Sequence, residues 1–384
     1  MLREEQIKIA RRILKHIENG TAESAPRQGR VPVSTYIDPE VWAREVDIFR
    51  TSPIVAGMSC ELPGPGSYMA REIVGRPVLL VRDQAGRLGA FLNVCRHRGS
   101  PVVGEGCGEA RRFSCPYHGW TYDQAGRLIG VAEEASFGPV DRATHGLTAL
   151  PVAERAGIIF LGLTPGMVFD IDGWLAGADR HLAAAEPETL RLAGTRTVQA
   201  PNWKITMEGH LESYHFATLH RESVAPFSFS NLALIDRFGP HILITFVRKS
   251  IVELRNLPES EWHPLRDGMI TPQYIFFPGV TVTLTGKGIL TQIIHPGAEV
   301  GQSTNRLVLG YDASLDDPAT AAEQSAFLDS VAALVDKEDY PGGFGIQRGM
   351  HSGAQTEVMF GRNEPGAIYF HEAIQAALKA AEPA

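Results

Sequence analysis

The chain has few cysteines and no long apolar run. Only four of its 384 residues are cysteine, too few for the disulfide framework typical of small secreted proteins. No segment approaches the roughly 18 consecutive apolar residues that indicate a membrane-spanning helix. Residues 1–5 also lack the apolar core of a signal peptide. We therefore expect a cytoplasmic protein without a membrane segment.

Basic residues are also in deficit. Lys and Arg number 36 against 44 Asp and Glu, which gives a formal net charge of −8 at pH 7. Nucleic-acid-binding proteins usually carry a basic patch, so this balance argues against nucleic acid as a partner. It leaves docking with a small electron carrier open. The dinucleotide-binding pattern G-x-G-x-x-G is missing as well, because the glycines within residues 104–108 have a different spacing.

Two of the four cysteines each lie close to a histidine. The pattern is Cys95-x-His97, then 17 residues, then Cys115-x2-His118. Zinc sites typically begin with two cysteines separated by two to four residues, which this pattern lacks. One Cys and one His from each of two loops suit a [2Fe–2S] cluster with two thiolates on one iron and two imidazoles on the other. The alternatives are a zinc ribbon or four unrelated surface residues.

The residues around these two pairs carry a family resemblance. Segments 95–99 (CRHRG) and 115–122 (CPYHGWTY) resemble the Rieske non-haem iron oxygenases, the catalytic α subunits of aromatic-ring-hydroxylating systems. In that family a [2Fe–2S] cluster receives single electrons and passes them to a mononuclear Fe(II) that activates dioxygen. The resemblance therefore implies a second metal site further along the chain.

His215 and His220 are candidates for this second site. They are five residues apart, so a regular α-helix would separate them by about 140° around its axis. Two ligands to one metal at this spacing need a widened or broken turn, and such irregular turns favour functional sites. Taken alone, the pair is better interpreted as two structural histidines. Together with the Asn-Trp-Lys triplet at 202–204 and the acid Glu212, it resembles the iron-binding signature of the family.

Non-haem iron that must also bind dioxygen is commonly held by two histidines and one carboxylate, which leaves coordination positions open. Segment 338–349 resembles the family pattern E-D-x7-Q-x-G, whose Asp is the third ligand. The resemblance assigns this role to Asp339 and leaves Glu338 as the alternative ligand. It places no ligand at His210, which we interpret as a hydrogen-bonding or pocket histidine.

The resemblance also implies how the two sites cooperate. In related proteins a carboxylate at the position of Glu212, often Asp, bridges a Rieske histidine of one subunit to an iron-ligating histidine of its neighbour. This implies an electron path from His118 through Glu212 to His215 of the next subunit, and hence a homotrimer. An α3β3 assembly with a small β subunit is the alternative. Electrons would come from a separate reductase or ferredoxin, with NAD(P)H as the ultimate donor.

The periodicity of the chain predicts an α+β fold. Helical spacing appears at 2–19, a second helix is expected from Asp38 to about residue 49, and short strands and turns follow from residue 68. Later strands are expected within the ranges 191–199, 241–254, 273–277, 280–285, 289–294 and 306–311, with helices from 317 and over 367–381. The resemblance implies an N-terminal β-rich Rieske domain and a C-terminal helix-grip (START-like) catalytic domain with an antiparallel sheet. We expect an N-terminal helix and linker over 1–33, the Rieske domain over 34–165 and the catalytic domain over 166–384.

The resulting hypothesis is an oxygenase that hydroxylates a small aromatic or alicyclic substrate with O2. Oxidative demethylation by a monooxygenase is the alternative within the family. Two hypotheses of another class are a Rieske electron carrier and a hydrophobic-ligand-binding protein without oxygenase activity. Phe216 and the apolar residues of segment 223–235 are candidates for the substrate pocket, although they also suit an ordinary core.

Overall fold

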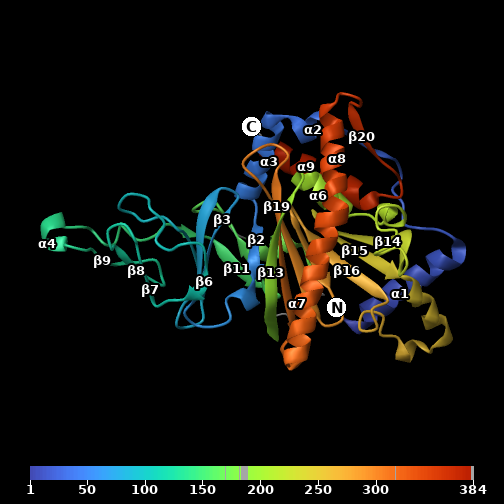
Figure 1. The fold of residues 1–384 in the computed structure, drawn as a ribbon, viewed down its shortest axis with the longest axis horizontal. Helices are drawn as coiled ribbons and strands as arrows, with labels where there is room; N and C mark the ends of the chain where they lie inside the picture. The colour runs from blue at the N-terminus through green and yellow to red at the C-terminus, as the bar shows by residue number, and fades with distance from the viewer. Residues whose placement is uncertain (169, 181, 183–188, 316, 382–384) are drawn as a thin grey trace. The chain divides into compact units, whose positions relative to one another are not determined.

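The computed structural model describes residues 1–168, 170–180, 182, 189–315 and 317–381. These form two compact units, one made of Met1–Ile48 with Asp172–Ala384 and the other of Phe49–Ile171 (Figure 1). Residues 34–48 thus belong to the first unit, together with the C-terminal half of the chain. The expected division at residues 33 and 165 remains a prediction.

The unit Phe49–Ile171 consists mainly of short antiparallel strands. Its largest sheet has five strands in the order β10-β5-β4-β3-β6, and two further sheets of three strands have the orders β11-β12-β2 and β7-β8-β9. The strand bounds are Ile54–Met58 (β2), Ser67–Ile73 (β3), Arg76–Arg82 (β4), Leu88–Leu92 (β5), Gly106–Glu109 (β6), Arg112–Ser114 (β7), Thr121–Asp123 (β8), Leu128–Gly130 (β9), Ala149–Leu150 (β10), Val152–Arg155 (β11) and Ile158–Leu161 (β12). A four-residue helix, α4 (Glu134–Phe137), follows β9.

Two hairpins of this unit use the same turn. The hexapeptide Asp-Gln-Ala-Gly-Arg-Leu occurs at 83–88 and at 123–128. Asp83 accepts hydrogen bonds from the backbone N–H and the guanidinium of Arg87, and Asp123 accepts the same pair from Arg127. The repetition is therefore the same turn used in two hairpins, and it joins strands next to the loops that carry the two Cys/His pairs.

The other unit is built on a seven-stranded antiparallel sheet of order β13-β19-β18-β17-β16-β15-β14. Its strands are Leu190–Ala200 (β13), Ser228–Phe238 (β14), His241–Arg248 (β15), Ile270–Phe276 (β16), Val280–Leu284 (β17), Gly288–Pro296 (β18) and Ser303–Asp312 (β19). Helices α7 (Pro318–Leu334) and α8 (Tyr340–His351) form a long column beside this sheet (Figure 1). The predicted α+β fold, with its antiparallel catalytic sheet, is confirmed.

Local signals predicted several element ends correctly. Asp317 caps α7 by accepting hydrogen bonds from the backbone N–H groups of Ala319 (2.9 Å) and Thr320 (3.0 Å). The tail helix is α9 (Pro365–Ala380). The expected extended run over 241–254 was wrong in its second half, because β15 ends at Arg248 and a 3₁₀ helix follows over Lys249–Asn256.

The N-terminal 51 residues include α1 (Arg3–Asn19), α2 (Ser34–Ile37) and α3 (Pro39–Thr51). Strand β1 (Gly29–Pro32) pairs with β20 (Glu357–Phe360), so the N-terminal segment is tied to the C-terminal part of its unit. Two short helices, α5 (Ile171–Leu175) and α6 (Trp203–Gly209), complete the helical elements used below.

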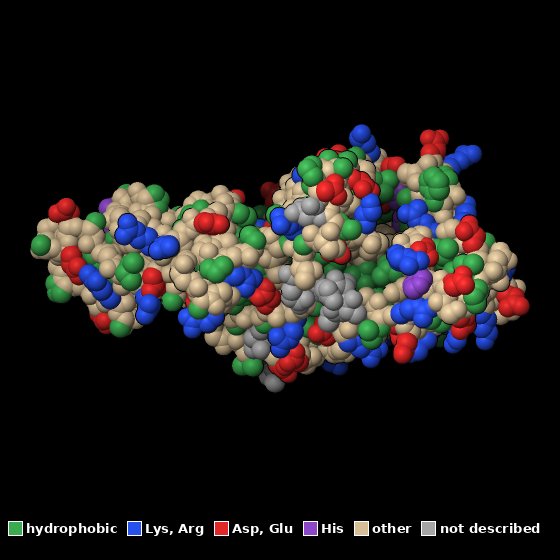
Figure 2. All heavy atoms as spheres, turned by 90° about the horizontal axis from the view of Figure 1, so that it is seen from below, with side chains coloured by type: hydrophobic (Ala, Val, Ile, Leu, Met, Phe, Trp, Pro, Cys, Tyr) green, Lys and Arg blue, Asp and Glu red, His purple; other side chains and the backbone are tan. Residues whose placement is uncertain are grey.

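Acidic and basic side chains are interspersed on the face seen in Figure 2, without a continuous area of one sign among its described residues. Within the described ranges, every helix is too short or too polar to cross a membrane.

Two candidate metal centres

The first candidate centre lies on two loops of the unit Phe49–Ile171. Cys95 and His97 follow β5, and Cys115 and His118 lie between β7 and β8. Both cysteines are buried and neither forms a disulfide. The rings of His97 and His118 lie edge to face with their centroids 4.7 Å apart. The four residues predicted from the sequence thus lie on two loops that bring both histidines into contact.

The histidine nitrogens of this site match a bound cluster. Nδ1 of His97 and Nδ1 of His118 are buried and have no hydrogen-bond partner among the described residues. A buried polar atom without a partner is costly and rare in proteins. Metal coordination would satisfy both atoms, and the two neighbouring thiols would supply the remaining ligands. The donor set therefore fits the [2Fe–2S] group that the spacing predicted.

Both loops have the same backbone design. In each, the glycine four residues after the cysteine donates its N–H to the cysteine carbonyl, at 3.0 Å for Gly99 and 2.9 Å for Gly119. These glycines have φ angles of 84° and 68°, a conformation that other residues adopt only with strain. The indole of Trp120 stacks on His97 with an interplanar angle of 12°. The loop and the stacked indole therefore fix the orientation of the His97 ring.

Tyr122 contacts the first loop from below. Its hydroxyl lies 3.3 Å from Sγ of Cys95 and accepts a hydrogen bond of 2.9 Å from the backbone N–H of Arg96. Burial, followed by the hydrogen bond to Cys95, raises the pKa of Tyr122 above its usual range. The hydroxyl therefore stays protonated at neutral pH and can donate its proton to the sulfur.

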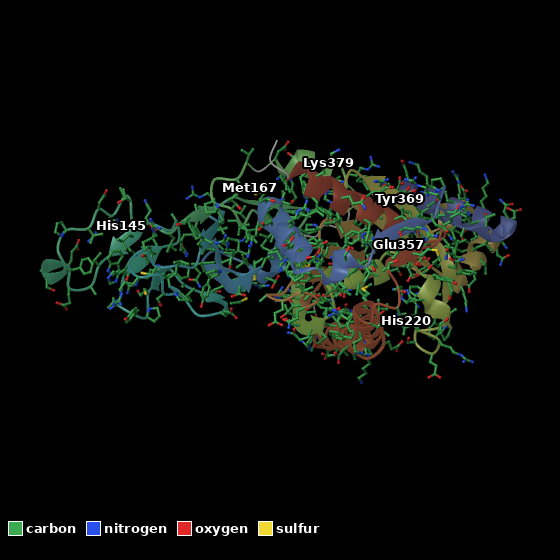
Figure 3. The ribbon with its side chains drawn as sticks, turned by 90° about the horizontal axis from the view of Figure 1, so that it is seen from above. His145, Met167, His220, Glu357, Tyr369 and Lys379 are labelled. Carbon is green, nitrogen blue, oxygen red and sulfur yellow. The ribbon has the colours of Figure 1, made fainter. Side chains whose placement is uncertain are left out.

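The second candidate centre joins His215, His220 and Asp339. One nitrogen of each histidine and one carboxylate oxygen of Asp339 lie within 4.8 Å of one another. Oδ1 of Asp339 is 3.1 Å from Nε2 of His220 and 3.9 Å from Nε2 of His215. His220 lies in a turn segment beside the long helix column (Figure 3). Two histidines and one carboxylate in this arrangement suit a ferrous ion with open positions.

Irregular backbone places all three candidate ligands. His215 lies in a 3₁₀ helix, Tyr214–Ala217, and the chain then turns, with N–H groups of two later residues bonded to the carbonyl of His220. Asp339 ends a π-helical turn, Val335–Asp339, between α7 and α8. The expected break at the histidine pair thus takes the form of a 3₁₀ turn. The π turn at Asp339 is a feature that the sequence did not indicate.

Two further carboxylates hold the opposite sides of the histidine rings. Nδ1 of His215 is hydrogen-bonded to Oε1 of Glu212. Nδ1 of His220 is 2.7 Å from Oε2 of Glu338, which also accepts a hydrogen bond of 2.7 Å from the hydroxyl of Ser223. The hydrogen bond from His220, followed by that from Ser223, lowers the pKa of Glu338. Metal-binding histidines usually have such partners, which fix the tautomer of the ring.

The Asn-Trp-Lys triplet anchors the short helix before this site. Asn202 caps α6 by accepting a hydrogen bond from the Lys204 backbone N–H (3.0 Å). The Lys204 ammonium forms a fully buried ion pair with Glu45 of α3. The indole N–H of Trp203 donates to the same carboxylate at 3.1 Å. Glu45 had no sequence signal, because it lies about 160 residues from its partners.

A cavity of about 310 Å³ lies beside the second centre. Its walls come from α6, α8, β20 and the start of α9, and they include His215 and Asp339. Its other lining residues are Pro201, Ile205, Thr206, Glu208, Gly209, His210, Glu212, Leu219, Val335, Tyr340, Gly342, Gly343, Ile346, Met350, Val358, Met359, Phe360, Glu364 and Ala367. Phe216 and residues 223–235, the expected pocket segment, do not line this cavity.

His210 lines the cavity without joining the group of three. Burial lowers its pKa to about 4, so it is neutral at pH 7. Phe216 instead packs against His215 and His220 and against Phe246 of β15, with ring centroids 5.0 to 5.7 Å apart.

Comparison with known families matches both parts of the chain. Residues 52–145 match the Rieske [2Fe-2S] domain, and residues 184–380 match the ring hydroxylating alpha subunit, catalytic domain. The chain is 36% identical over 200 residues to the glycine betaine monooxygenase oxygenase subunit of Chromohalobacter salexigens, which is 51% of this chain and 44% of that protein. It is 31% identical over 213 residues to the carnitine monooxygenase oxygenase subunit of Escherichia coli (54% and 55%). It is 34% identical over 200 residues to the chlorobenzene dioxygenase subunit alpha of a Cupriavidus strain (50% and 44%).

These alignments span about half the length of each relative. Solved structures extend the likeness of the fold to nearly the whole chain. A quaternary ammonium Rieske monooxygenase in complex with L-carnitine has a TM-score of 0.76 at 21% identity, covering 90% of this chain and 94% of that one. Naphthalene 1,2-dioxygenase from Rhodococcus has a TM-score of 0.76 at 19% identity, covering 98% and 99%. With a Rieske [2Fe–2S] domain followed by a matching catalytic domain, this chain belongs to the family of ring-hydroxylating α subunits.

Proposed function

We propose that the chain is the oxygenase component of a Rieske non-haem iron system, which uses O2 and externally supplied electrons to oxidise a small organic substrate. The observation that carries the proposal is the group His215, His220 and Asp339, in the same chain as the two Cys/His loops. An electron carrier would need only the loops. A ligand-binding module would need neither site, nor the carboxylates that orient both histidines.

The roles of the residues follow from the donor atoms. We assign the [2Fe–2S] cluster to Cys95, Cys115, His97 and His118. The buried Nδ1 atoms of the two histidines have no hydrogen-bond partner among the described residues. We assign a mononuclear Fe(II) to His215, His220 and Asp339. Bound there, the cluster would supply single electrons and the Fe(II) would bind and activate O2.

Glu212 is proposed as the link between the two kinds of site in different subunits. Its carboxylate lines the cavity and holds Nδ1 of His215. Around that cavity Leu219, Ile346 and Met359 are 40 to 56% exposed, and exposed apolar groups of this kind favour a protein contact. We propose that in a homotrimer the loop carrying Tyr117 and His118 of a second copy docks at the exposed rim of the cavity, against these apolar residues. A solved relative is described as revealing inter-subunit electron transfer, which supports the route.

For the substrate, we propose oxidative demethylation of a quaternary ammonium compound as the first candidate. Two of the relatives named above act on glycine betaine and carnitine. The aromatic rings of Phe216 and Phe246 lie beside the ligand histidines, and aromatic faces attract quaternary ammonium groups. The second candidate is hydroxylation of an aromatic or alicyclic ring, which the same rings could stack against and which other relatives perform on benzene and chlorobenzene.

Electrons would reach the cluster from a separate reductase or ferredoxin, with NAD(P)H as their ultimate source. The test is oxygen uptake by iron-loaded protein with a surrogate reductase, over a panel of betaines, aromatic acids, alicyclic acids and methyl ethers. Loss of one methyl group from a product, detected by mass, supports demethylation. A gain of two oxygen and two hydrogen atoms supports ring dihydroxylation instead. Protein with about three irons and two sulfides per chain that reduces no O2 with any compound would contradict the oxygenase proposal.

A further inference from the structure

Three titratable groups from distant parts of the chain meet behind one wall of the cavity. Tyr36 of α2 donates a hydrogen bond of 2.7 Å to Oε1 of Glu208 on α6. Nε2 of His371, on α9, is 2.8 Å from the same oxygen and 3.2 Å from the Tyr36 hydroxyl. None of the three is a member of the candidate metal group. Their convergence on one oxygen atom needs an explanation beyond metal binding.

Only Glu208 of this triad reaches the cavity. It lines the same cavity as His215 and Asp339, whereas Tyr36 and His371 are buried behind it and do not line it. Oε1 of Glu208 is in hydrogen-bond contact with both Tyr36 and His371, whereas Oε2 accepts no hydrogen bond from the described residues. One carboxylate thus has a buried side with two potential donors and a free oxygen on the side of the cavity.

The other ionisable groups around the cavity are already engaged. Glu212 bonds His215 and the backbone N–H groups that follow it, and Asp339 belongs to the candidate iron site. His210 is neutral because burial lowers its pKa to about 4. Glu364, at the start of α9, accepts the N–H of Gly361, and burial raises its pKa. Glu208 differs from these groups because its carboxylate contacts His371, a histidine outside the candidate metal group that can supply a proton.

The groups facing the triad define its charge balance. Lys204 lies on the same helix as Glu208, but its ammonium group forms an ion pair with Glu45 of α3. Burial, followed by the charge of Glu208, raises the pKa of Tyr36 well above its usual value, so its hydroxyl remains a fixed donor. The hydrogen bond along which a proton can pass therefore joins the Glu208 carboxylate to the His371 imidazole, and Glu212 and Glu364 are the other glutamates that line the cavity.

We propose that Glu208, backed by His371 and oriented by Tyr36, donates a proton to the reaction at the candidate iron site, because His215 and Asp339 of that site line the same cavity as Glu208. The proposal rests on the proposed oxygenase function. In a monooxygenation, R–H, O2, two electrons and two protons become R–OH and H2O, and the electrons come from the separate reductase. Glu208 gives one of the two protons and solvent gives the other: the O–H bond of Glu208 breaks and an O–H bond of the product water forms. The carboxylate then takes the Nε2 proton of His371, which is replaced from solvent.

The test compares Glu208→Gln with wild type in single turnovers of pre-reduced, iron-loaded protein, with a substrate that wild type converts. Gln has nearly the same shape and can still accept from Tyr36 and His371, but it cannot pass on a proton. We expect product formation to slow by about 100-fold, the typical contribution of general acid catalysis, and to show a larger solvent deuterium isotope effect. Iron content, melting temperature and the rate of cluster reduction should match wild type.

Two further variants separate proton donation from a structural role. Glu208→Asp keeps the carboxylate and should restore most of the rate and the wild-type pH profile. Glu372→Gln, one residue after His371 but on the exposed side of α9, should behave as wild type. A low-field imidazole N–H proton resonance is expected in the metal-free wild type, and it should be absent in His371→Asn and move upfield in Glu208→Gln.

Each contrary result has a distinct meaning. Equal rates, pH profiles and isotope effects for wild type and Glu208→Gln would overturn the proton-donor role while leaving the oxygenase function intact. Equal losses of rate, iron and melting temperature in Glu208→Gln and Glu208→Asp would also overturn it, in favour of a structural clamp. Failure of fully loaded and reduced wild type to consume O2 with any compound would overturn the oxygenase function itself, and the proton-donor role with it.

Discussion

The side-chain oxygen of Gln347 accepts a hydrogen bond of 3.0 Å from the backbone N–H of Asn202. The contact joins two sequence motifs that are 145 residues apart, Asn-Trp-Lys and the segment that carries Asp339. Asn202 also donates its side-chain N–H to the carbonyl of Tyr36 at 2.9 Å. One residue thus connects α6 with α2 and with α8.

Replacing Gln347 by Ala should therefore destabilise the catalytic unit. The N–H of the buried Asn202 would lose its partner, at a cost of about 1 to 3 kcal/mol. Because Gln347 lies on the same helix column as Asp339, the iron content should also fall. Urea denaturation and iron analysis check both expectations. Gln302→Ala, at an exposed glutamine, is the matched control, and equal stability of the two variants would contradict the role of this contact.

The ion pair between Lys204 and Glu45 predicts strong non-additivity. Lys204→Met should lower the free energy of unfolding by about 3 to 5 kcal/mol, because it leaves a buried carboxylate without its cation. Combining it with Glu45→Leu removes both charges and should recover much of that loss. Denaturant titration of the two single variants and the double variant measures the coupling. A double variant as unstable as the sum of the singles would show that the two charges do not interact.

Short motifs indicated the chemistry of this chain more directly than periodicity indicated its helices and turns. Cys95, His97, Cys115 and His118 could be proposed as cluster ligands because each loop has its Cys and His within four residues. Asp339 could be proposed only from its family pattern, since the π turn that presents it depends on the packing of α7 and α8. The 3₁₀ turn around His215 was expected only as some break in a helix.

Long-range partners left no local signal. Glu45, Tyr36 and His371 lie far in sequence from the groups that they contact, so their roles depend on tertiary packing. Strand β14 was read as pocket lining because its apolar residues suit a ligand site as well as a sheet. In the structure Leu232 and Leu234 are instead buried on that strand.

Tyr122→Phe should lower the reduction potential of the cluster. The hydroxyl lies 3.3 Å from Sγ of Cys95, and a hydrogen bond to a cluster sulfur stabilises the reduced, more negative state. A net contribution of about 1 kcal/mol corresponds to about 40 mV for a one-electron couple. Spectroelectrochemical titration measures the shift. Tyr117 is 55% exposed, so Tyr117→Phe is the control and should leave the reduction potential unchanged. A shift of equal size in the control would rule out a specific effect of Tyr122.

Glu338 and Asp339 should differ sharply when each is changed to its amide. Asp339→Asn removes a proposed ligand and should abolish stable binding of the mononuclear iron. Glu338→Gln removes only the partner of His220 Nδ1, which should weaken metal affinity by about 10- to 100-fold. Iron retained per chain during titration with a chelator distinguishes them. Complete iron loss in Glu338→Gln with retention in Asp339→Asn would identify Glu338 as the ligand.

Glu212→Gln tests the proposed route between subunits. The amide can still bond to His215, so both the cluster and the mononuclear iron should remain in place. The variant loses the carboxylate that is proposed to bind His118 of the next subunit, so the side chain no longer orients both histidine rings. Oxidation of the reduced cluster on mixing with O2 and substrate should therefore slow by at least about tenfold. Stopped-flow absorbance of the cluster, with product measured in the same samples, gives both rates. Normal cluster oxidation with normal product yield would exclude Glu212 from the electron path, whereas loss of the mononuclear iron would restrict its role to holding His215.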